Sequence, residues 1–150
     1  MATSYFSRAM ALAALAAARL AAPGAAQLIT SDSVAKVSVV HGQDVYPAGE
    51  SFRLLFKLEI APGWHTQSHA PSMEGLIATR LVLTADQGIA FGRVAYPQPV
   101  MERFAFSPDP LSVFRETVYL GVTGAVPPDA APSEAQARAV LTVQACDDKS

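Results

Sequence analysis

From residue 51 to residue 60 the chain alternates apolar and polar side chains with a period of two. The apolar residues fall on one face of this segment and the charged residues on the other, with Leu55 as the exception. Such alternation is typical of a β-strand with one face in a core and one in solvent. We therefore predict a strand over 51–60 that belongs to a β-sandwich.

Further strand-like segments follow the same pattern and are separated by turn residues such as Asp86-Gln87-Gly88 and Pro127-Pro128-Asp129. They cover residues 34–41, 78–84, 89–96, 113–122 and 138–146. No long amphipathic pattern of helical period occurs beyond the N-terminal region, and the chain contains 11 prolines. Many short strands without such a helix predict an all-β fold, most simply an immunoglobulin-like antiparallel β-sandwich.

Residues 1–26 have a different pattern. Arg8 precedes a short apolar run over 9–18, and small residues occupy positions −3 and −1 of a cleavage site before Gln27. The run suits a signal peptide and is shorter than the roughly 20 residues that span a bilayer. A soluble Ala-rich helix is the alternative, but Arg19 interrupts it. We predict that 1–26 is a signal peptide and that 27–150 is one exported domain.

Composition limits the possible partners of this domain. The chain is 51% hydrophobic and 16% charged, which is too apolar for a disordered protein. Its formal net charge is −2, and no run of Lys or Arg occurs. Because a basic surface is the usual mark of a nucleic-acid-binding protein, we expect no nucleic acid partner.

Export makes the cysteine count informative, because cysteines in an oxidising compartment normally occur in pairs. The chain has one cysteine, Cys146, which is therefore a reactive thiol or half of a pair whose partner lies elsewhere. It lies four residues before the last residue, Ser150. The polar residues that follow it do not complete a further strand or helix. We expect the domain to be truncated at its C-terminus.

The surroundings of Cys146 allow two interpretations. By alternation along 138–146, its side chain lies opposite the more apolar face of the strand, so the thiol would point toward the surface. The alternative is a small buried hydrophobic residue, since free cysteines are often buried. Asp147 and Asp148 follow directly, and like charges disfavour a thiolate, so we expect the pKa of the thiol to be raised.

Two other segments contain residues of chemical interest. His65 and His69 have a spacing that would place both on one face of a helix, but neighbouring prolines and a glycine predict a loop or a strand start. Without a third ligand close in sequence, we expect no metal site, and no phosphate loop or nucleophile elbow suggests another cofactor. Phe104 and Phe106 stand in a proline-bounded stretch, where they either pack in the core or cover something.

Four motifs together resemble the N-terminal periplasmic domain of the thiol:disulfide interchange protein DsbD and its relatives. They are Gly63-Trp64-His65, Tyr96-Pro97-Gln98-Pro99, Phe104-Ala105-Phe106-Ser107 with Pro110-Leu111-Ser112-Val113-Phe114, and Gln144-Ala145-Cys146-Asp147-Asp148-Lys149. The last motif is the most specific. The resemblance covers roughly residues 52–150 and implies an immunoglobulin-like fold.

The resemblance also implies roles for individual residues. Cys146 matches the first of two redox cysteines, the second of which follows a few residues later in the family. The segment with Phe104 and Phe106 resembles the family's cap loop, in which an aromatic ring covers the active disulfide. Trp64 and His65 match a Gly-Trp-His stretch of relatives near the site, without an implied redox role, and Asp147 and Asp148 flank the cysteine.

The function implied by the resemblance is a relay of reducing equivalents. Such a domain takes electrons from a membrane-embedded reductase domain and passes them to periplasmic thioredoxin-fold oxidoreductases. An alternative is an immunoglobulin-like envelope binding module in which Cys146 is structural or links two chains. A third hypothesis is a metal-handling protein that uses His65, His69 and Cys146.

Overall fold

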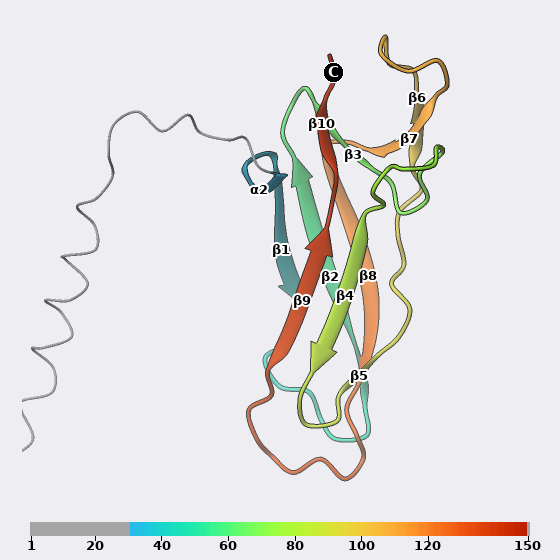
Figure 1. The fold of residues 1–150 in the computed structure, drawn as a ribbon. Helices are drawn as coiled ribbons and strands as arrows, with labels where there is room; N and C mark the ends of the chain where they lie inside the picture. The colour runs from blue at the N-terminus through green and yellow to red at the C-terminus, as the bar shows by residue number, and fades with distance from the viewer. Residues whose placement is uncertain (1–30, 150) are drawn as a thin grey trace, which may run out of the picture.

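The computed structural model describes residues 31–149, so the predicted signal peptide lies outside the described residues. Within this range, strands dominate and the only α-helix is a single short turn (Figure 1). The elements are α2 (Ser31–Val34), β1 (Ala35–His41), β2 (Ser51–Ile60), β3 (Trp64–Gln67), β4 (Arg80–Ala85), β5 (Ala90–Phe91), β6 (Val100–Glu102), β7 (Leu111–Phe114), β8 (Thr117–Ala125), β9 (Ala137–Thr142) and β10 (Ala145–Asp147). No helix among the described residues has the length and apolar character needed to cross a membrane.

The strands form three antiparallel sheets. Their strand orders are β1-β2-β8-β5, β10-β3-β7-β6 and β4-β9. In Figure 1 the β4–β9 pair crosses in front of β2 and β8, and the side chains between them form the main core. The fold is an immunoglobulin-like antiparallel β-sandwich, which confirms the predicted fold class.

The main core is built from the apolar faces that the alternation predicted. Phe56 and Leu58 of β2 are buried and pack with Leu120 and Val122 of β8 and with Leu81 of β4. The 51–60 strand is therefore confirmed with its predicted bounds. Its alternation arises because successive side chains of a strand point to opposite faces.

Two predicted strands are each divided between two sheets. The prediction of one strand over 113–122 is wrong. β7 ends at Phe114 and β8 begins at Thr117, and Glu116 at the corner between them has a φ of 56°. A left-handed residue redirects the chain, so β7 pairs with β3 whereas β8 pairs with β2. Alternation along the sequence continues across such a corner and does not reveal it.

The prediction for 138–146 is wrong in the same way. β9 ends at Thr142 and pairs with β4, whereas β10 begins at Ala145 and pairs with β3. Alternation counted from β9 therefore does not determine the face of Cys146. The segment 89–96 is also shorter than predicted, since only β5 and an isolated bridge between Ala95 and Gly121 form there. The short strand β3 fits the strand start that was one of two alternatives for the segment with His65, whereas β6 was not predicted.

Candidate functional site

Cys146 lies on β10, an outer strand of the β10-β3-β7-β6 sheet. It pairs directly with His65 of β3, and Asp147 pairs with Trp64. Directly paired residues of antiparallel strands place their side chains on the same face. The thiol and the His65 ring therefore share one face of this sheet. Cys146 is half-buried, and His65 is fully buried.

The two phenylalanines lie over the His65 ring. The Phe104 ring stacks on it with centroids 4.2 Å apart, and the Phe106 ring lies 5.1 Å from Phe104 and 6.4 Å from His65. Phe104 is 7% exposed and joins a small core cluster, whereas Phe106 is 43% exposed. Phe104 is thus anchored in the interior, and Phe106 forms the outer ring of the stack.

The segment between β6 and β7 holds these rings in a tight turn. The Ser107 N–H donates to the Phe104 carbonyl at 3.1 Å, and the Ser107 hydroxyl donates to the Asp109 carbonyl at 2.7 Å. Phe104 also packs with Leu111 and Val113 of β7. The aromatic segment is therefore fixed at the start of β7 as well as on β3.

A charged cluster connects this segment with the strand that carries the cysteine. Arg115 donates through Nε and Nη2 to the Glu102 carboxylate, and through Nη1 and Nη2 to Asp148 at 3.0 and 2.9 Å. His65 Nδ1 lies 3.1 Å from Asp148 Oδ1. The Arg115 guanidinium also lies 5.6 Å from the centre of the Phe104 ring.

These contacts shift the pKa values of the charged groups. Hydrogen bonds from Arg115 lower the pKa of Asp148, with a smaller contribution from His65. The Glu102 and Asp148 carboxylates raise the pKa of Arg115. Burial raises the pKa of the Cys146 thiol, and the Asp147 charge raises it further. The predicted direction for the thiol is confirmed, although burial, and not charge, is the larger cause.

Sequence reasoning missed Arg115 and did not give Glu102 a role. Arg115 lies at the corner that divided the predicted strand 113–122, where it was counted as part of a continuous strand. The adjacent charged residues Arg115 and Glu116 interrupt a largely apolar segment, and this interruption was the one sequence feature that could have indicated a corner there. Trp64, by contrast, is half-buried against the main core and lies beside Asp147 in the ladder.

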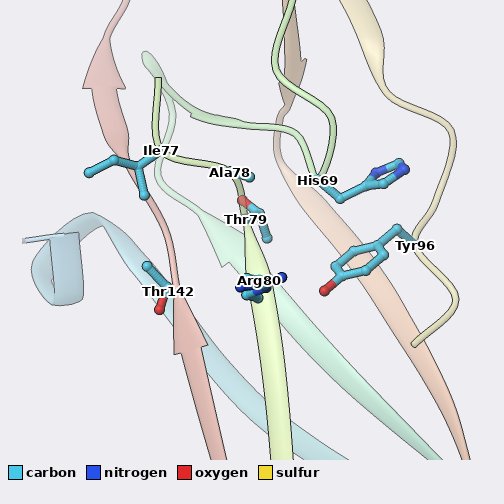
Figure 2. A pocket seen from close by; sticks show the side chains of 7 residues that line it. All are labelled: His69, Ile77, Ala78, Thr79, Arg80, Tyr96 and Thr142. Atoms are coloured by element: carbon cyan, nitrogen blue, oxygen red, sulfur yellow. The ribbon is translucent and has the colours of Figure 1, made fainter. Parts of the chain in front are cut away.

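His69 lies apart from this cluster. Its ring stacks on Tyr96 with centroids 4.7 Å apart, and both residues line a pocket of about 650 Å³ near the start of β4 (Figure 2). Across residues 31–149, no group of three or more His, Cys, Asp or Glu side chains could hold a metal ion. The structure therefore does not support a metal site built from His65, His69 and Cys146.

Comparison with known proteins relates this arrangement to a family. The family model described as thiol:disulfide interchange protein DsbD, N-terminal, matches residues 25–150. No curated protein matched. Among solved structures, the chain is similar to the N-terminal periplasmic domain of ScsB from Proteus mirabilis, with a TM-score of 0.53 and 17% identity.

That alignment covers 81% of this chain and 44% of the ScsB chain, so this chain spans less than half of that structure. At this identity the likeness shows the fold alone. The family match is broader, because it extends over most of the sequence and includes Cys146 and the aromatic segment. The protein belongs to the family of DsbD N-terminal domains, which are thiol:disulfide interchange domains.

Proposed function

We propose that this protein is a periplasmic thiol–disulfide exchange domain with Cys146 as its reacting thiol. In this role it passes reducing equivalents from a membrane-embedded reductase domain to periplasmic thioredoxin-fold proteins. The observation that carries the proposal is the position of the chain's one cysteine. It lies in the middle of the short strand β10, opposite buried His65, whose ring stacks with Phe104 and Phe106.

The exchange proceeds in two steps. The Cys146 thiolate attacks one sulfur of a partner's disulfide, a mixed disulfide forms, and the partner's other sulfur leaves as a thiolate. A second cysteine, which we place a few residues after Cys146 and beyond Ser150, then attacks the Cys146 sulfur. The partner leaves with both thiols reduced, and the domain keeps the disulfide until the membrane-embedded domain reduces it.

The surroundings of the thiol suit a donor that must stay reduced among oxidants. A raised pKa keeps most of the thiol protonated near neutral pH, and the protonated form is a poor nucleophile. The aromatic segment 103–110, which we call the lid, lies over the same face and limits access. Phe106 is the exposed ring of the lid, so a docking partner meets it first.

A trapping experiment tests the proposal. The 150-residue chain has no second cysteine to resolve a mixed disulfide, so an intermediate should accumulate. The probe is a thioredoxin-fold domain whose buried cysteine is replaced by serine and whose exposed cysteine is activated with thionitrobenzoate. We expect a one-to-one adduct through Cys146, and Cys146→Ser should abolish it.

The control is an unrelated protein that carries an exposed cysteine activated in the same way. We expect the thioredoxin-fold probe to react faster than this control, because docking displaces the lid. Equal rates with both proteins, or no adduct, would contradict the relay. Absence of an adduct would favour an immunoglobulin-like binding module with a structural cysteine.

A further inference from the structure

We propose that Arg115 is a positioning residue that holds the lid closed over the cysteine. With Glu102 and Asp148 it forms what we call the clasp. This inference rests on the proposed function, because it assigns the control of access to the reacting thiol. The clasp joins the two outer strands of one sheet: Glu102 ends β6, and Asp148 directly follows β10.

The placement of the two carboxylates connects the lid to the cysteine. Glu102 lies two residues before Phe104, at the point where the chain leaves β6 and enters the lid. Asp148 lies two residues after Cys146, just past the end of β10, and its carboxylate contacts His65, the residue paired with Cys146. Arg115 binds each carboxylate through two nitrogen–oxygen contacts. One guanidinium therefore ties the stem of the lid to the strand of the thiol.

The lid itself is also held by the segment 72–76, since the Ser72 hydroxyl donates to the Pro110 carbonyl at 2.9 Å and Leu76 packs against the core cluster of Phe104. Its stem, by contrast, has few strand contacts. β6 pairs with β7 over three residues only, and its other edge has no strand partner in the described sheet. The backbone at Arg115 is better fixed, because the Ile60 N–H donates to the Glu116 carbonyl at 2.6 Å beside the corner. The clasp thus attaches a weakly paired segment to a rigid part of the sandwich.

Arg115 also acts on the lid directly. Its guanidinium lies over the Phe104 ring at a distance suited to a cation–π contact. Asp148 accepts from Arg115 and contacts His65, on which Phe104 stacks. The contacts therefore form a continuous series: Phe104 of the lid stacks on His65, and His65 contacts Asp148. Asp148 binds Arg115, which in turn binds Glu102 at the stem of the lid. Opening the lid must therefore break several charge-assisted contacts together.

The planar guanidinium is required for this arrangement. Arginine can present several N–H groups in one plane and bind two carboxylates at once, whereas lysine presents a single compact charge. The side chains of Arg115, Glu102 and Asp148 are 25%, 33% and 32% exposed, so dissolved salt reaches them. A clasp of this kind weakens as ionic strength rises.

The test measures access to Cys146 in the complete 150-residue chain. The reagent is iodoacetamide, which is uncharged, so salt does not change its own approach. The alkylation rate is followed upward in pH until it reaches a plateau, where the thiol is fully ionised. Arginine and the carboxylates stay charged there, so the plateau reports access and not the pKa of the thiol.

We expect Arg115→Met to raise the plateau rate on the order of fivefold, and Glu102→Gln to raise it by a smaller factor. Arg115→Lys should fall between Arg115→Met and the unchanged protein. Raising NaCl from about 0.05 to about 0.5 M should speed alkylation of the unchanged protein but not of Arg115→Met. The matched control is Arg138→Met on the exposed strand β9, which should change neither the rate nor its salt response.

An unchanged plateau in both Arg115→Met and Glu102→Gln, or a salt response that survives in Arg115→Met, would overturn the clasp. If circular dichroism shows that Arg115→Met does not fold, Glu102→Gln and its salt response decide the question alone. The proposed function is judged separately by the adduct with the thioredoxin-fold probe. Loss of that adduct in the unchanged protein would reject the relay, whereas normal adduct formation with an unchanged plateau would reject only the clasp.

Discussion

His65 lies directly opposite Cys146 in the β3–β10 ladder, and its buried ring carries the stacked ring of Phe104. Phe104 therefore rests on the strand next to the cysteine, while Arg115 connects the stem of the lid to Asp148, directly after the cysteine's own strand. The two phenylalanines of the aromatic segment differ: Phe104 is buried and packs, whereas Phe106 is exposed and is the ring to which the proposed function assigns the cover of the thiol.

Phe104→Ala and Phe106→Ala should have different effects. Phe104 is buried, so its truncation should cost about 3 kcal/mol of the free energy of unfolding. Phe106 is 43% exposed, so its truncation should cost less than about 1 kcal/mol but should raise the alkylation rate of Cys146 several-fold. Urea denaturation and iodoacetamide kinetics measure the two quantities.

The control for this pair is Val82→Ala on β4, a half-exposed apolar residue outside the lid. It should leave the alkylation rate unchanged. A Phe106→Ala protein that reacts at the rate of the unchanged chain would show that Phe106 does not cover the thiol.

Asp148 should make the stability of the protein dependent on acid pH. Its pKa in the folded state is below the ordinary value of 3.8, because Arg115 stabilises the carboxylate. Its contribution is therefore fully present above the unfolded pKa and is lost as the pH falls through the lower folded pKa. Asp148→Asn should remove part of the stability at pH 7, on the order of 1 kcal/mol or less because the group is partly exposed.

Urea unfolding midpoints of the unchanged protein and of Asp148→Asn, measured from about pH 6 to about pH 2, check this prediction. The difference between the two midpoints should shrink as the pH falls. Asp129→Asn, in an exposed turn, is the control and should leave the curve nearly parallel to that of the unchanged chain. A difference between Asp148→Asn and the unchanged protein that stays constant over the whole range would contradict the lowered pKa.

The thiol of Cys146 should ionise at a higher pH in the folded chain than in urea. Burial is the larger cause of its raised pKa, and Asp147 is the smaller one. Asp147→Asn should therefore lower the midpoint of the alkylation–pH profile only in part, leaving it above the value of the unfolded chain. A midpoint in Asp147→Asn equal to that of the unfolded protein would show that charge, and not burial, dominates.

Under oxidising conditions, the 150-residue chain should form dimers joined through Cys146. The half-buried thiol is reachable, and no second cysteine in this chain competes for it. Non-reducing electrophoresis should show a band at twice the monomer mass that Cys146→Ser removes. Phe106→Ala should form this band faster, while a chain that remains monomeric would count against an accessible thiol.

Much of the sandwich follows from local sequence. The alternation in 51–60 determines the strand, its bounds and its buried face, because side-chain direction in a strand depends only on position. The turn residues around 86–88 likewise separate strands that the structure confirms as distinct. The motif around Cys146, with the three other motifs, indicated the family without any tertiary contact.

The site itself depends on contacts that local patterns do not contain. The His65–Asp148 contact spans 83 positions, and the Arg115–Asp148 contact spans 33. The apolar–polar alternation continues across the corner at Glu116 and across the break after Thr142. It therefore does not indicate that strands end at these two places. The sequence by itself determined the strand 51–60, the fold class and the position of the one cysteine. Only the tertiary structure decided the clasp and the stacked lid, because strand register and corners bring distant charged and aromatic side chains onto one face.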